Sequence, residues 1–75
     1  PQATAENIAA IVARLEAQLA ELQTRRTGLQ SFLQPQAPQL AEVNTQIAAV
    51  EQQLVRERAR LAAPEGGTLN RTVEE

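Results

Sequence analysis

The sequence has no cysteine and no histidine, and it also lacks methionine, tryptophan and tyrosine. The absence of cysteine excludes disulfides and thiol nucleophiles. The absence of histidine removes the commonest general base and the commonest zinc ligand. We therefore expect no enzyme activity, no metal site and no cofactor.

Charged residues are equally restricted, because every basic residue is arginine and every acidic residue is glutamate, with a net charge of -2. The basic cluster Arg56, Arg58 and Arg60 contains Glu57 and has no aromatic residue beside it for base stacking. Nucleic-acid binding is therefore not expected. No apolar run approaches the roughly 20 residues of a membrane span, so the chain itself is not expected to insert into a membrane.

What remains is a chain of 75 residues rich in alanine, leucine, glutamine, glutamate and arginine, which are strong helix formers. This composition predicts one small all-α domain, elongated rather than globular. The sequence starts at Pro1 and ends at Glu75, within a pattern typical of the first turn of a helix. We expect it to be a segment of a longer protein.

The first half carries a heptad pattern of apolar residues in alternating steps of four and three. It predicts a helix over residues 4–33, with Thr4 as the N-cap and Glu6 favourably placed in the first turn. The predicted core positions of this helix are Ile8, Val12, Leu15, Leu19, Leu22, Leu29 and Leu33.

A second heptad pattern predicts another coiled-coil helix over residues 38–63. Pro38 suits a first helical position, where its missing amide costs nothing, and Pro64 with Gly66 and Gly67 ends the pattern. The predicted core positions of this helix are Leu40, Val43, Ile47, Val50, Leu54 and Leu61.

Residues 34–37 separate the two helices, and the prolines at 35 and 38 push the residues before them away from helical angles. A short link favours antiparallel packing, so the fold class is an antiparallel two-helix coiled-coil hairpin with arms of roughly 40 Å. One register pairs Leu15 with Leu54, Leu19 with Val50 and Leu22 with Ile47. A register shifted by one heptad pair is the alternative.

Residues 64–75 form a glycine-rich turn followed by Thr72 and Glu75 at capping-box spacing, which indicates the start of a truncated third helix.

A second apolar column lies beside the core positions of the second helix and predicts a homo-oligomeric surface. A two-helix hairpin leaves much of such a stripe in water, which favours packing against further copies. The alternative is that alanine is present only as a good helix former. The residues of this predicted oligomer face are Ala41, Ala48, Val55 and Ala62.

Arg26 and Glu57 each place a charge at a core heptad position. Such residues can fix register or partner number, so both are candidate register residues. The alternative is that both side chains extend past small neighbours to water. At the tip, Phe32, Pro35 and Pro38 form a small apolar cap, which either docks a partner or, through Phe32 and Leu33, closes the end of the core.

The string from Leu33 to Leu40 with its two prolines, followed by the run Ile47-Ala48-Ala49-Val50-Glu51, resembles a periplasmic region of the capsule polysaccharide export inner-membrane proteins. This family is related to the polysaccharide co-polymerases, or chain-length determinants. The Arg-Glu-rich stretch from Arg56 to Leu61 and the later Gly67-Thr68-Leu69-Asn70-Arg71 also resemble it. The resemblance covers about residues 20–75.

The resemblance implies a periplasmic coiled-coil segment of an inner-membrane protein, serving as spacer and self-assembly element of a trans-envelope export complex. It implies an ABC transporter and an outer-membrane polysaccharide export channel as partners of the parent. Two other hypotheses are the hairpin of a periplasmic adaptor protein, which docks a channel through its tip, and the coiled-coil appendage of an enzyme.

Overall fold

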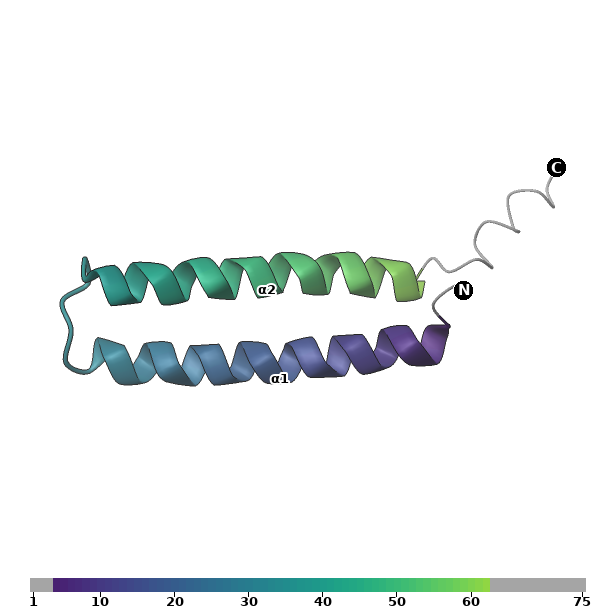
Figure 1. Cartoon of the computed structure of the whole chain (residues 1–75), viewed down its shortest axis with the longest axis horizontal. Coiled ribbons are helices and arrows are strands. Elements are labelled where there is room, and N and C mark those ends of the chain that lie inside the picture. Colours follow the sequence, from purple (N-terminus) through teal and green to yellow (C-terminus); the bar gives the residue numbers. More distant parts are fainter. Residues whose placement is uncertain (1–3, 63–75) are drawn as a thin grey trace, which may run out of the picture.

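The computed structural model describes residues 4–62, which form two helices, α1 (Ala5–Gln30) and α2 (Pro38–Ala62). The helices lie side by side and run in opposite directions, joined at one end by a short link (Figure 1). No strand occurs in this range. The predicted all-α helical hairpin is therefore confirmed.

Helix α1 begins where the sequence predicts an N-cap. Thr4 has extended backbone angles, and its hydroxyl accepts a hydrogen bond from the amide of Asn7 at 3.0 Å. Glu6 lies in the first turn, where its charge favours the helix dipole. Both interactions lie within the first turn, so they stabilise it independently of the second helix.

Helix α1 ends at Gln30, earlier than the predicted end at residue 33. The amide and hydroxyl of Ser31 both bind the carbonyl of Gly28, at 3.2 and 2.6 Å, which tightens the last turn. Beyond it, Pro35 disfavours helical angles at Gln34. The link therefore spans residues 31–37, and the predicted loop 34–37 is only its second half.

Helix α2 starts at Pro38, as the sequence predicts. In its first turn, the amides of Leu40 and Ala41 both donate to the carbonyl of Ala37, at 3.0 and 3.2 Å. The proline occupies a position where a missing N–H leaves no acceptor unpaired. The described helix ends at Ala62; residue 63 and the predicted turn and third helix at 64–75 lie outside the described residues.

The interior of the hairpin is a single seam of aliphatic side chains between α1 and α2. Every predicted core residue is buried or half-buried. The buried ones are Ile8, Leu15, Leu40, Val43, Ile47, Val50 and Leu54, and the half-buried ones are Val12, Leu19, Leu22, Leu29, Leu33 and Leu61.

Leu15, Val50 and Leu54 form one buried cluster, and Leu19 and Leu22 pack against it. This grouping agrees with the register that pairs Leu15 with Leu54 and Leu19 with Val50. Ile47 is buried outside this cluster. The short link favours this register. Sliding one helix by a heptad would move it by about 10 Å, and the apolar side chains nearest the tip would then lose their partners on the other helix.

Candidate interaction surfaces

The described residues hold no cluster of three or more acidic side chains able to bind a metal ion. Between residues 4 and 62, neither helix combines the length and apolar character needed to cross a bilayer. No buried side-chain nitrogen or oxygen in this range lacks a hydrogen-bond partner.

One side of the seam is bridged by polar contacts between the two helices. Arg26 donates from Nη1 to Oδ1 of Asn44 at 3.1 Å, and Arg58 donates from Nη2 to Oε2 of Glu16 at 2.7 Å. Asn44, Glu16 and Arg58 each follow a core position by four residues, which places them on the same side of the seam. The Glu16–Arg58 pair is half exposed at both ends, so its contribution is about 1 kcal/mol or less.

The candidate register residues Arg26 and Glu57 do not contact each other. Arg26 is half-buried against Asn44, while the Glu57 side chain is only 13% exposed and accepts from Arg60 at 3.0 and 3.3 Å. The Arg60 side chain is half exposed and lies between Glu57 and the solvent. Glu57 thus stays within the seam, whereas the alternative from the sequence had it extend to water.

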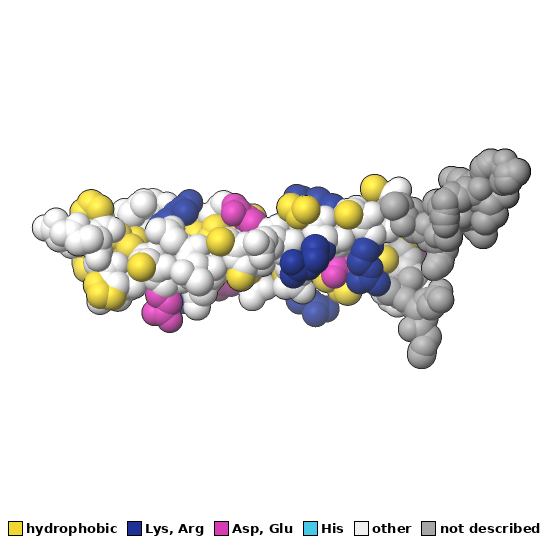
Figure 2. Space-filling model, turned by 90° about the horizontal axis from the view of Figure 1, so that it is seen from above, with side chains coloured by type: hydrophobic (Ala, Val, Ile, Leu, Met, Phe, Trp, Pro, Cys, Tyr) yellow, Lys and Arg dark blue, Asp and Glu magenta, His cyan; other side chains and the backbone are white. Residues whose placement is uncertain are grey.

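All residues of the predicted oligomer face, Ala41, Ala48, Val55 and Ala62, are exposed. Val55 is 65% exposed, because it lies about 100° around the helix from the buried Leu54. Figure 2 looks onto the α2 side and shows hydrophobic atoms in separate groups along the shaft, with an arginine cluster toward the end away from the link. The column is accessible but narrow.

At the tip, Phe32 is 72% exposed and does not close the core. Its amide binds the carbonyl of Leu29, which keeps the backbone turning, while Leu33 is half-buried. Pro35 and Pro38 are exposed and Ala37 is half-buried in the turn closed by its bond to Gln34 at 3.0 Å. Of the two sequence hypotheses for Phe32, the closing role is wrong.

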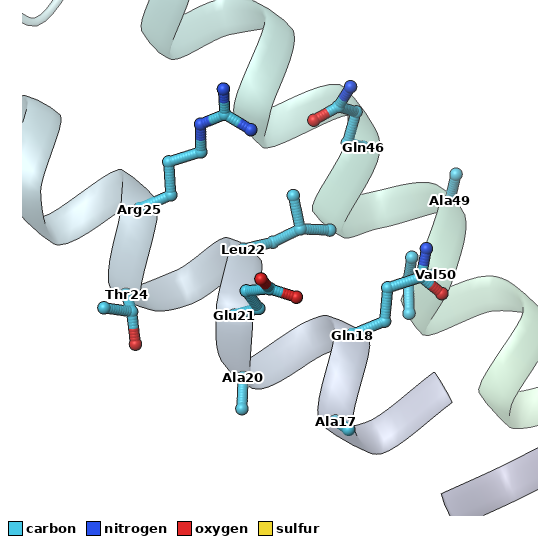
Figure 3. Close-up of a pocket in the computed structure, with 10 residues that line it drawn as sticks. All are labelled: Ala17, Gln18, Ala20, Glu21, Leu22, Thr24, Arg25, Gln46, Ala49 and Val50. Carbon is cyan, nitrogen blue, oxygen red and sulfur yellow. The ribbon is translucent and has the colours of Figure 1, made fainter. Parts of the chain in front are cut away.

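The other side of the seam is an open groove between the helices. Figure 3 shows Leu22 pointing from α1 toward α2, with Arg25 and Gln46 beside it on the two helices. The groove continues toward the tip past Leu29 and Val43. Side chains from both helices line its wider part, namely Gln18, Glu21, Leu22, Arg25, Gln46, Ala49 and Val50.

Sequence reasoning missed Asn44, the Glu16–Arg58 pair and the groove. Polar residues beside an apolar seam usually form a solvated face, so no contact between these residues is predicted from the sequence alone. A signal was present nonetheless: once Leu15 is paired with Leu54, the polar positions four residues after Val12 and Leu54 come to the same side of the antiparallel pair. That geometry brings Glu16 and Arg58 within reach of each other.

No protein-family model, no curated protein and no solved structure matches this chain.

Proposed function

We propose that this chain is the periplasmic coiled-coil segment of an inner-membrane capsular polysaccharide export protein, serving as spacer and self-assembly element of the export complex. The resemblance around the proline tip and the Ile47–Glu51 run supports the family. The parent would act with an ABC transporter and an outer-membrane export channel. This role is mechanical and requires no cofactor.

The self-assembly in this proposal is supported by one observation: each helix is covered on one side only, by the other helix. Every buried side chain of residues 4–62 lies in the single seam between them, while Val55 on the outer column is 65% exposed. Two helices that pack only on each other bury little apolar surface, compared with the conformational entropy that the chain loses when it folds. Lateral contacts with further copies supply the missing burial.

The spacer part follows from shape. Helices of 26 and 25 residues give a shaft of about 40 Å at about 1.5 Å per residue. A shaft of two packed antiparallel helices suits a component that sets a distance between two layers of an envelope. The tip and the open end then mark the two boundaries of that distance.

A replacement experiment in the parent protein tests this function. Residues 5–62 are exchanged for a flexible glycine-serine linker of equal residue number in a capsulated bacterium that encodes the chain. Surface capsule should fall sharply while the parent remains in the inner membrane, as measured by capsule staining and membrane fractionation. Normal capsule with the linker in place contradicts the proposal.

The second candidate, a hairpin that docks a channel protein through its tip, is favoured by the exposure of Phe32. An aromatic ring held in water at the end of a stiff loop is typical of an anchor residue at an interface. Phe32→Ala should then abolish export while leaving self-association unchanged. Gln36→Ala in the same loop serves as the matched control, and equal export by Phe32→Ala and this control contradicts docking.

A further inference from the structure

The outer side of α1 carries a second row of regularly spaced residues, all with small side chains. At about 100° per residue, this row lies roughly opposite the buried positions of the helix. Figure 3 shows two of its members, Ala20 and Thr24, pointing away from α2, whereas Leu22 points toward it. We name it the α1 row, and its exposed members are Ala10, Ala13, Ala17, Ala20, Thr24 and Thr27.

An equivalent row on α2 contains the predicted oligomer face and continues it, again in steps of three and four. Thr45 donates its hydroxyl to the carbonyl of Ala41 at 3.0 Å, so its polar group is satisfied within the helix and its methyl group is free for contact. Val55, which is 65% exposed, is the largest apolar side chain of the row. The exposed members of this α2 row are Ala41, Thr45, Ala48, Gln52, Val55, Ala59 and Ala62.

The two rows can meet between copies that point the same way. Within one hairpin, α1 and α2 are antiparallel (Figure 1). When both tips lie at the same end, as anchoring in one membrane requires, the α1 row of one copy meets the α2 row of the next copy as another antiparallel pair. Small side chains on both faces let the two helices approach closely.

Glu21 and Arg56 flank these rows, and each follows a member of its row by one residue. In an antiparallel pair, equivalent positions of this kind lie along the same edge of the contact. Both side chains are exposed, and neither forms an ion pair within residues 4–62. Along the shaft, Arg56 lies about 12 Å further from the tip than Glu21, so the two do not pair within one hairpin.

These charges distinguish between the possible levels of the next copy. Moving it by one heptad, about 10 Å, toward the tip of the first copy brings its Arg56 beside Glu21. Without this shift, Arg56 faces Arg14, which carries a like charge. A shift in the other direction places Glu42 beside Glu21, again a like pair. Of the three levels, the first brings opposite charges together.

We infer that copies of this chain assemble side by side with their tips at the same end, the α1 row of each against the α2 row of the next, at the level that pairs Glu21 with Arg56. The inference rests on the self-assembly proposed above and names the contact that mediates it. The partner surface is therefore a different face of the same chain, so the contact repeats from copy to copy.

The same level matches the side chains of the two rows. Ala20 of one copy faces Val55 of the next, so the largest apolar side chain meets one of the smallest. Thr24 faces Gln52, the one long polar side chain of the α2 row, and its hydroxyl bonds the carboxamide. Without the shift, Gln52 would face Ala17 and have no polar partner there.

A shift between neighbours is compatible with a closed ring. Each hairpin is about 20 Å wide, which is two helix diameters of about 10 Å. A shift of about 10 Å over that width corresponds to shafts tilted by about 25–30° from the ring axis, because tilt and stagger are linked in any barrel-like array. All tips of such a ring lie at one height.

Charge exchange in the 75-residue chain tests the contact. Glu21→Arg and Arg56→Glu should each weaken association by about ten-fold, because an attraction becomes a repulsion. The double exchange, and an equimolar mixture of the two single variants, should restore it. Glu42→Arg is the matched control. Glu42 occupies the same heptad position as Arg56 but lies beyond the end of the neighbouring α1, so this variant should associate as the parent chain does.

Each variant is checked by circular dichroism to remain helical, and association is measured by sedimentation equilibrium. If Arg56→Glu associates more tightly than the parent chain, the inference is overturned, because Arg56 then faces Arg14 at the unshifted level. Single variants that associate normally, or a double exchange that does not recover, also overturn it. In these cases the parent chain still assembles, so the proposed self-assembly stands.

Cross-linking identifies the facing residues, because the chain has no cysteine of its own. Under mild oxidation, a mixture of Ala20→Cys and Val55→Cys chains should give covalent dimers with one chain of each kind. Ala20→Cys mixed with Ala48→Cys, the pair expected without the shift, is the control and should give few. Preferential cross-linking of the control, or of Ala20→Cys with itself, overturns the inference. A parent chain that stays monomeric at the highest concentration overturns the proposed self-assembly as well.

Discussion

Arg26 of α1 and Asn44 of α2 are joined by a hydrogen bond of 3.1 Å across the seam. Arg26 occupies a core heptad position, yet its charge reaches a neutral acceptor at the edge of the seam instead of entering the apolar interior. A half-buried arginine held in this way is tolerated without an acidic partner. The bond also ties the helices at a fixed level, toward the end of the shaft that carries the link.

Replacing Arg26 tests whether this polar position controls assembly. Arg26→Leu should raise the free energy of unfolding by about 1 kcal/mol, because an apolar side chain completes the seam. It should also change the oligomer number, since polar core positions restrict partner number. Urea denaturation and sedimentation equilibrium measure the two effects. An unchanged oligomer number contradicts the specificity role, and Asn44→Ala controls for loss of the hydrogen bond alone.

The neighbours Leu54 and Val55 separate core stability from assembly. Leu54 is 2% exposed, so Leu54→Ala should cost about 2–5 kcal/mol and unfold the hairpin. Val55 is 65% exposed, so Val55→Ala should leave the unfolding of dilute chains nearly unchanged. Thermal melts by circular dichroism at low concentration compare the two. Equal destabilisation by both variants would show that α2 is rotated from the described orientation.

Much of this fold could be predicted from the sequence because heptad spacing is a local property. Leu54 and Ile47 are buried where the spacing places them, and α2 starts at Pro38 because proline is favoured at the first helical position and disfavoured in the helix interior. Phe32 could not be assigned, because its exposure depends on α1 ending at Gln30, which in turn depends on the bonds of Ser31 to Gly28.

The N-cap offers a local test of α1. Thr4→Ala should lower the free energy of unfolding by about 1 kcal/mol, because the Asn7 amide loses its acceptor. Thr4→Asn should keep most of the stability, since asparagine caps equally well. Chemical denaturation of the three chains decides the matter, and an alanine variant as stable as the parent would show that the first turn frays.

Gly28 offers a test with the opposite sign. Its φ is not positive and nothing lies near its missing Cβ, so Gly28→Ala should stabilise the isolated hairpin by about 0.5–1 kcal/mol. Urea denaturation in dilute solution measures this effect, and loss of stability there would reveal a backbone constraint at this glycine.

The central claim is that this hairpin is incomplete alone and assembles with further copies. Sedimentation equilibrium across a wide range of chain concentrations tests it most directly. The account predicts a mass that rises with concentration from one hairpin to a defined oligomer, with helicity rising in parallel. A strictly monomeric, fully helical chain at the highest concentration would contradict it.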